Sequence, residues 1–214
     1  MLMYKLYYYP GNANLAPHML LEEIGATYEL VLLDRDKQQH KSPEYLKLNP
    51  HGRIPTLVDG DLVLFETAAI CLHLVDRHPE ARLAPELGTP ERAHFYKWLI
   101  YLTNTVQAGM IMYYYPQRWA STEAGAADVK RHAEQHLNAM FDTIEQSLGE
   151  KGPYLLGNRY SAADPYLLML GRWSRGFGRP ARTLPKLGKL METVAARPAV
   201  QRAFAGEGIT SPFY

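Results

Sequence analysis

At the start of the chain, two short apolar runs flank one segment with helical periodicity. Residues 4–9 form an aromatic and apolar run that Pro10 and Gly11 end, and residues 28–33 form a run rich in valine and leucine. Between them, leucine and isoleucine recur at helical spacing over residues 14–24. The pattern predicts a strand–helix–strand unit whose two strands run parallel.

The next group of elements continues the same domain. A short helix, two strands joined by an Asp-Gly-Asp turn and a further helix follow in order, at residues 43–48, 54–58, 62–65 and 66–77. Apolar residues lie almost all round the last helix, which is typical of a mostly buried helix. The first part of the chain is therefore predicted to have the order β-α-β-α-β-β-α.

After this group, proline and glycine gather over residues 79–90, and every later segment has helical periodicity. Helices are predicted at residues 91–112, 126–148, 161–173, 184–195 and 199–205. We therefore predict an α/β domain over residues 1–80, a linker over 81–89 and an all-helical domain over 90–214.

Composition narrows the class of protein. Of 214 residues, 47% are apolar and 21% charged, so the chain can bury a core without metal or disulfide staples. A formal net charge of +1 provides no general attraction to nucleic acid or an anionic membrane. No apolar run approaches the roughly 20 residues that span a bilayer. A single cysteine, Cys71, and a start without signal-peptide character predict a cytoplasmic protein.

A proline opens the third predicted strand, in the sequence Arg53-Ile54-Pro55-Thr56. Proline has no N–H for a β-ladder, so it fits a strand edge as a trans residue, and the residues alone favour that interpretation. The alternative is a cis Ile54–Pro55 bond, which would turn the N–H and C=O of Ile54 outward to pair with a peptide ligand.

Glu66 and Thr67 stand where the fourth strand passes into a helix. A helix N-terminus leaves backbone donors free and its dipole favours an anion, to which the Thr67 hydroxyl adds a donor. Glu66 could pair with an α-ammonium group, so the two residues suit the amino-acid end of a ligand. The alternative is that they only cap the helix.

The segment that follows the first strand, residues 8–14, offers donors near a helix start. The amides of Asn12 and Asn14 could stabilise a ligand thiolate there, although asparagine cannot take the proton. The alternative for Asn14 is a purely structural N-cap of the following helix.

Three further signals indicate structure rather than chemistry. Ser161 and Asp164 form a capping-box pattern, worth about 0.5–2 kcal/mol each. His132 and His136 lie one helical turn apart, but the glutamate between them is misplaced for a zinc protease, so we predict no metal site. Cys71 lies in a helix predicted to be buried and is expected to be inert.

Several motifs occur in a fixed order along the chain. They are YYYPG at residues 7–11, LAPH at 15–18, LEE at 21–23, PEYLKLNPHGRIPTL at 43–57, FETAAI at 65–70, LLGNRYSAAD at 155–164 and RPAV at 197–200. By these motifs, from about Met3 to Phe204, the chain resembles the soluble glutathione transferases and especially their bacterial members. Each motif alone is weak, but their order and spacing together are specific.

The resemblance implies a thioredoxin-like domain followed by an all-α domain, with glutathione as co-substrate. It implies that Ile54 holds the cysteinyl backbone of glutathione through a cis-Pro55 turn, which reverses the preference for a trans bond. It implies that Glu66 and Thr67 hold the γ-glutamyl end. The residues implied at the glycine end and the nearby backbone are His40, His51 and Arg53.

The chain departs from the bacterial beta class of that family at two positions. Ala13 stands where that class has a cysteine, and Gln107 stands where it has a histidine. Neither residue can supply a thiol or a proton that titrates near neutral pH. The predicted thiol-activating residue is therefore Asn12, followed by Asn14 and then Tyr8.

The resemblance predicts a transferase that conjugates the glutathione thiol to a small, hydrophobic electrophile and acts in detoxification. Glutathione-dependent disulfide or peroxide reduction is related chemistry, and a homodimer is implied. The residues predicted to bind the electrophile are Gln107, Met110, Tyr114, Arg118 and Trp173. The alternative, which Ala13 and Gln107 keep open, is a non-catalytic binding or regulatory protein of the same fold.

Overall fold

The computed structural model describes residues 3–214, and these divide into two compact units. One unit contains the chain up to Ala84 together with Ala195–Phe213, and the other contains Pro85–Val194 and Tyr214. We describe each unit by itself.

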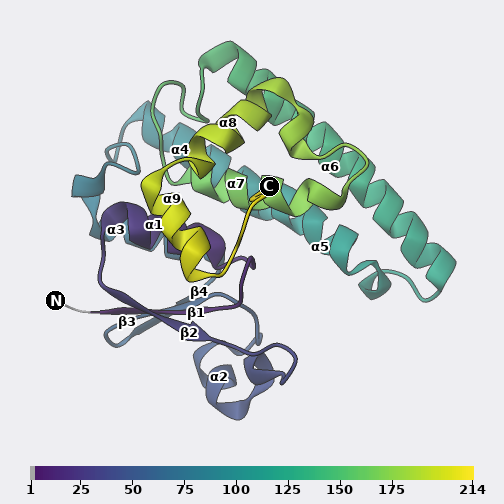
Figure 1. The fold of residues 1–214 in the computed structure, drawn as a ribbon, viewed down its shortest axis with the longest axis horizontal. Helices are drawn as coiled ribbons and strands as arrows, with labels where there is room; N and C mark the ends of the chain where they lie inside the picture. Colours follow the sequence, from purple (N-terminus) through teal and green to yellow (C-terminus); the bar gives the residue numbers. More distant parts are fainter. Residues whose placement is uncertain (1–2) are drawn as a thin grey trace. The chain divides into compact units, whose positions relative to one another are not determined.

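A four-stranded mixed sheet forms the centre of the first unit, in the order β2-β1-β3-β4 (Figure 1). The strands are β1 (Tyr4–Tyr8), β2 (Tyr28–Leu32), β3 (Thr56–Asp59) and β4 (Leu62–Phe65). As predicted, β1 and β2 are parallel, whereas β3 runs antiparallel to both β1 and β4. The arrangement confirms the predicted thioredoxin-like α/β fold.

Helices cover both faces of this sheet. They are α1 (Leu15–Ile24), α2 (Pro43–Leu48), α3 (Thr67–Arg77) and α9 (Pro198–Gly206), with single 3-10 turns η1 (Gln39–Lys41) and η2 (Pro79–Ala81). In Figure 1, α1 and α3 lie over one face and α2 lies beyond the other. Helix α1 packs against both α3 and α9, so its residues from Leu15 to Leu21 are all buried.

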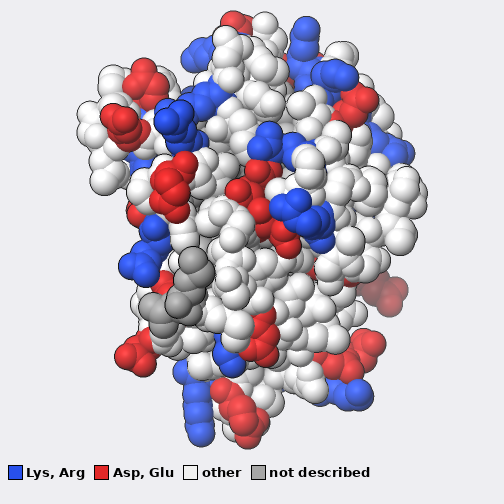
Figure 2. Space-filling view, turned by 60° about the vertical axis from the view of Figure 1, so that its left-hand side comes forward, with Lys and Arg blue, Asp and Glu red and all other residues white. Residues whose placement is uncertain are grey.

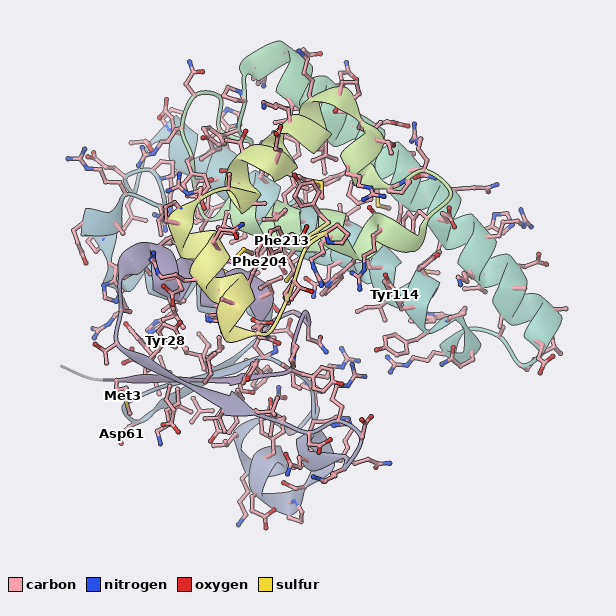
Figure 3. All side chains as sticks on the ribbon, in the orientation of Figure 1. Met3, Tyr28, Asp61, Tyr114, Phe204 and Phe213 are labelled. Carbon is pink, nitrogen blue, oxygen red and sulfur yellow. The ribbon has the colours of Figure 1, made fainter. Side chains whose placement is uncertain are left out.

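Helix α9 is the main departure from the predicted division of the chain. The sequence pattern assigned residues 195–213 to the helical domain, whereas their packing joins them to the α/β unit. Two arginines tie α9 to α1: Arg197 makes a bidentate pair with Glu23 at 2.5 and 2.8 Å, and Arg202 binds Glu22 at 2.6 Å. The Phe204 and Phe213 rings also stack, with centroids 4.7 Å apart (Figure 3). Local periodicity carries no information about such distant partners.

The second unit contains the remaining helices. They are α4 (Pro90–Ile100), a π-helical stretch η3 (Tyr101–Gln107), α5 (Ala108–Tyr114), α6 (Glu123–Lys151), α7 (Ala163–Trp173) and α8 (Pro185–Ala195), with 3-10 turns η4 (Pro116–Arg118), η5 (Ser174–Gly176) and η6 (Ala181–Thr183). The helix predicted over residues 91–112 is therefore interrupted by the π-helical stretch. Such wide turns are rare and frequently lie near functional residues.

Charge on the surface is mixed in sign. Figure 2 shows lysine and arginine side chains interspersed with aspartate and glutamate over the face in view. Among residues 3–214, no helix combines the length and apolar character that crossing a membrane requires.

Candidate active site

Three loops meet at one end of the sheet because of strand direction. Tyr7 pairs with Thr56, and Thr56 pairs with Phe65. Strands β1 and β4 therefore end at the same edge at which the antiparallel β3 begins. Asn12 and Asn14 lie in the segment after β1, Ile54 and Pro55 in the segment before β3, and Glu66 and Thr67 directly after β4. The structure thus brings together the three features that the sequence singled out separately.

The loop before β3 contains a cis peptide bond between Ile54 and Pro55, which confirms the expectation drawn from the resemblance. The C=O of Arg53 accepts hydrogen bonds from Tyr45 Oη at 2.6 Å and Asn49 Nδ2 at 2.9 Å, so this loop is held firmly. Among the residues described, neither the N–H nor the C=O of Ile54 has a hydrogen-bond partner. Both groups are available to an extended ligand.

The loop after β4 has unusual backbone geometry. Glu66 has φ of 74° and ψ of 113°, and its side chain makes no capping hydrogen bond to α3. A non-glycine residue held in such a sparsely populated conformation costs about 1–3 kcal/mol, and residues of this kind cluster at active sites and ligand clamps. The Glu66 carboxylate is exposed, and within residues 3–214 it has no ion-pair or hydrogen-bond partner. Glu66 is the N-cap residue of α3, since its C=O accepts from the Ile70 N–H at 3.0 Å, but its side chain takes no part in the cap and remains available.

Thr67 is the first residue of α3 and is only 4% exposed. In the described part of the chain, its hydroxyl makes no hydrogen bond. The first backbone N–H groups of a helix also have no partner within that helix. Thr67 thus provides a hydroxyl next to free backbone donors, beside the Glu66 carboxylate.

The two asparagines of the loop after β1 have different surroundings. Asn14 is fully buried; its Oδ1 accepts from the Tyr9 N–H at 3.1 Å and its Nδ2 donates to Glu207 at 2.8 Å. Asn14 is the N-cap residue of α1, where its C=O accepts from the His18 N–H at 2.9 Å, but its side chain makes no hydrogen bond to that helix, so the amide is not a purely structural cap of α1. Asn12 is half-buried, and its Oδ1 accepts from the Ala13 N–H at 2.9 Å. No partner among the described residues occupies Asn12 Nδ2.

Tyr8 is the last residue of β1 and lies next to this loop. Burial, followed by the charge of Glu207, raises the pKa of Tyr8 above its ordinary value. Its phenol therefore remains protonated at neutral pH and can act there as a hydrogen-bond donor, but not as a base.

The residues predicted to hold the glycine end belong to the same unit. The His51 ring packs edge-on against Phe65, with centroids 5.5 Å apart, and Arg53 is exposed beside Ile54. His40 lies nearby, because a Cβ on Gly52 would stand only 2.7 Å from the His40 C=O, a position that requires glycine. Burial, followed by nearby cations, lowers the pKa of His40, and its buried Nδ1 has no hydrogen-bond partner among residues 3–214.

The residues predicted to bind the electrophile lie in the helical unit. Gln107 accepts a hydrogen bond from the Tyr166 hydroxyl, and the Tyr114 hydroxyl donates to the Trp173 C=O. Met110 is 1% exposed, whereas Arg118 is exposed and its guanidinium stacks 4.2 Å from the Tyr115 ring centroid. Tyr114 and Trp173 are thus brought together, and the binding role of the group stays a prediction.

One residue near the site was missed by sequence reasoning. Glu207, which follows α9, is 4% exposed and binds the loop after β1. It lies in a Gly-Glu-Gly sequence with no periodicity or motif that marks it as buried. Only the packing of α9 against α1 reveals its position.

The remaining side chains with metal-binding or thiol chemistry are the histidines, acidic residues and Cys71 of the described part. Within residues 3–214, no group of three or more histidine, cysteine, aspartate or glutamate side chains is arranged to hold a metal ion. Cys71 is fully buried, and burial raises the pKa of its thiol.

We therefore expect Cys71 to resist thiol reagents while the protein is folded, because thiolate is the reactive form and this thiol is neither ionised nor accessible. Incubation with a chromogenic disulfide reagent should label less than a tenth of the protein in buffer and all of it in guanidinium chloride. Full labelling of the folded protein within minutes would contradict this assignment.

Comparison with known proteins points to one family. The family model for the glutathione S-transferase N-terminal domain matches residues 2–76, and that for the C-terminal domain matches residues 107–205. Glutathione S-transferase GstA of Escherichia coli O157:H7 is 28% identical, covering 96% of this chain and 99% of the relative. Glutathione S-transferase 3 of Zea mays is 31% identical, covering 97% of this chain and 96% of the relative.

Among solved structures, a glutathione transferase homologue from Sulfitobacter with bound glutathione has a TM-score of 0.88 and 30% identity. The match covers 98% of this chain and 100% of the Sulfitobacter chain. The two domain models match most of the chain, and the relatives match over nearly its whole length. These matches agree with the arrangement of loops at the end of the sheet. This chain therefore belongs to the glutathione S-transferase family.

Proposed function

We propose that this protein is a glutathione transferase that joins the glutathione thiol to a small hydrophobic electrophile. The observation that carries the proposal is the set of unpaired polar groups at one end of the sheet. The Ile54 backbone, the Glu66 carboxylate and the Thr67 hydroxyl all lack partners among the described residues. Glutathione can satisfy all three at once.

Each end of glutathione finds a complementary group. The γ-glutamyl carboxylate suits the Thr67 hydroxyl and the start of α3, and the ammonium group suits Glu66. The cysteinyl N–H and C=O can pair with the Ile54 backbone as an added strand would. We assign the glycine carboxylate to Arg53, with His40 and His51 beside it.

The thiol then lies nearest the loop after β1, where Asn12 Nδ2 is available as a donor. A hydrogen bond to sulfur stabilises the thiolate and lowers the pKa of the glutathione thiol. The proton leaves to solvent, since an amide cannot accept it. The thiolate donates its electron pair to the electrophilic carbon, a C–S bond forms, and the leaving group departs with the electrons of the bond that breaks.

We assign the electrophile to the helical unit, at Gln107, Met110, Tyr114, Arg118 and Trp173. The tyrosine and tryptophan rings and the methionine offer an adaptable apolar surface. Glutathione-dependent disulfide or peroxide reduction, a homodimeric assembly, a cytoplasmic location and a role in detoxification belong to the same proposal.

Isothermal calorimetry with reduced glutathione tests the binding site. Glu66→Gln removes the charge that pairs with the ammonium group, and Thr67→Val removes a hydrogen bond to the carboxylate. Each should weaken binding about 10- to 100-fold, because a hydrogen bond to a charged group is worth roughly 1.5–3 kcal/mol. The matched control is Glu29→Gln, since Glu29 is an exposed carboxylate that pairs with Lys5 at 3.2 Å near the start of β1. It should bind as the unchanged protein does.

Absence of heat at millimolar glutathione, with the protein folded, would overturn the proposal. If Glu66→Gln and Glu29→Gln bind glutathione equally well, the assignment of Glu66 to the site is wrong. Thr67→Val then tests the assignment of Thr67 separately.

The second candidate is a non-catalytic protein that binds glutathione, and Ala13 and Gln107 favour it because neither activates a thiol. Ultraviolet thiolate absorbance of the bound ligand, followed against pH, separates the two functions. A transferase lowers the pKa of the bound thiol below that of free glutathione. An unchanged pKa would favour the binding protein.

A further inference from the structure

A single carboxylate from the C-terminal segment holds the loop after β1. Both oxygens of Glu207 are occupied: Oε2 accepts from the Gly11 N–H at 2.8 Å, and Oε1 accepts from Asn14 Nδ2 and His18 Nδ1, each at 2.8 Å. These contacts join positions 189 to 196 residues apart in sequence. The Glu207 and His18 side chains have no exposed surface.

The two loop residues that Glu207 holds lie on either side of Asn12. The loop is closed by further bonds, because Asn14 Oδ1 accepts from the Tyr9 N–H at 3.1 Å and the Asn12 N–H donates to the Tyr9 C=O at 3.1 Å. The backbone at Asn12 is therefore fixed from both sides, while its Nδ2 has no partner among the described residues.

A chain of hydrogen bonds links the other side of His18 back to α9. His18 Nε2 lies 3.0 Å from the Tyr28 hydroxyl, which in turn binds Glu22, and Glu22 pairs with Arg202 at 2.6 Å. Tyr28 is labelled in Figure 3 beside the sheet. Since Arg202 and Glu207 both come from the α9 segment, this network fastens that segment to α1 and β2 and so fixes the carboxylate.

Burying a carboxylate is strongly unfavourable unless its hydrogen bonds are satisfied. An apolar residue would hold α9 against α1 without that cost, but it could not hold the N–H of a loop. The charged residue thus provides what hydrophobic packing cannot, which is a definite position for Gly11 and Asn14.

We propose that Glu207 is a positioning residue for the conjugation reaction: through Gly11 and Asn14, its carboxylate holds the loop in the conformation that presents Asn12 Nδ2 to the glutathione sulfur. This inference rests on the proposed function. The Glu207 side chain has no exposed surface, so it acts through the loop and not by contact with a ligand.

The test is Glu207→Gln, which keeps the shape but replaces one oxygen by an NH₂ group. The NH₂ group must face either the Gly11 N–H or the Asn14 and His18 donors. At least one of the three hydrogen bonds that Glu207 accepts is therefore lost. We expect kcat to fall about tenfold, as the loss of one hydrogen bond to a charged group predicts, and KM for glutathione to change less than about twofold. The pKa of the bound thiol should rise toward that of free glutathione.

The matched control is Arg197→Gln, which removes the bidentate pair with Glu23 at the start of α9 but leaves the Arg202–Glu22 pair and every hydrogen bond of Glu207 in place. It should lower Tm while leaving kcat and the thiol pKa unchanged. Hydrogen exchange at the Gly11 amide, measured without ligand, should accelerate in Glu207→Gln and not in Arg197→Gln.

A Glu207→Gln protein with unchanged kcat and thiol pKa would overturn the inference, and so would an equal loss of kcat in Arg197→Gln. If Glu207→Gln does not fold, Glu207→Asp serves instead, because its shorter side chain cannot reach all three donors; undiminished kcat there would equally overturn it. Should the unchanged protein bind no glutathione, the proposed function fails, whereas the Gly11 exchange still tests the contact made by Glu207.

Discussion

Replacing Asn12 with alanine is expected to lower kcat by roughly 10- to 100-fold while binding of glutathione persists. Asn12 Nδ2 is a side-chain donor of the loop after β1 without a partner in the described part of the chain. The Asn14 amide, by contrast, is buried and bound to Tyr9 and Glu207. Loss of the Asn12 amide should therefore raise the pKa of the bound thiol, which absorbance against pH would measure.

Asn12→Asp is the matched variant for this experiment. It has nearly the same shape but replaces the donor by a second oxygen and adds a negative charge, which disfavours a thiolate nearby. We expect a larger loss than for alanine. Unchanged kcat in Asn12→Ala would show that another group activates sulfur, and Tyr8→Phe would then be the variant to measure.

Replacing Asp164 with alanine is expected to cost about 3 kcal/mol of unfolding free energy, more than the capping pattern alone predicts. Asp164 is fully buried at the start of α7. Its Oδ2 accepts from the Ser161 N–H at 2.7 Å and from the Ser161 hydroxyl at 3.2 Å, which fits the predicted capping box in part. Its Oδ1 also accepts from the Leu155 N–H at 3.0 Å, a link that the motif does not include. Alanine leaves both backbone donors buried without partners.

Calorimetry should record a decrease in Tm of roughly 6–12 °C for Asp164→Ala, at about 2–4 °C per kcal/mol for a chain of this length. The matched control is Asp128→Ala, because Asp128 is an exposed helical carboxylate whose pair with Arg131 is 3.1 Å long. Its change should stay within about 0.5 kcal/mol. Similar Tm values for the two variants would contradict the structural role of Asp164.

The strands and helices of this protein were predictable where residues close in sequence, such as a proline or a turn, set their ends. The short helix at Pro43–Leu48 and the strand at Leu62–Phe65 end at the predicted residues, since Pro43 sits at the start of the helix and turns bound the strand. The π-helical stretch at Tyr101–Gln107 was not predicted, because its residues fit an α-helical period equally well.

Candidate site residues were predictable where they stand at the end of an element. Ile54 precedes a strand, and Glu66 and Thr67 follow one, so their place at one end of the sheet follows from the order and direction of the strands. The role of Asn14 was not predictable in this way. Its local sequence fits an N-cap whose side chain binds the helix. In the folded chain its amide is buried and donates to the Glu207 carboxylate instead.

The sequence alone determined the order of strands and helices, which depends on side-chain periodicity and on turn residues that act over a few positions. Ile54, Glu66 and Thr67 were candidates by their chemistry and their place at the ends of strands, and the resemblance of the motifs to a known family implied the thioredoxin-like fold. Tertiary structure alone decided that residues 195–213 pack on the α/β unit and that Glu207 holds the loop of Asn12. The reason is physical: a buried carboxylate is stable only where distant donors converge on it, and that convergence exists only in the folded chain.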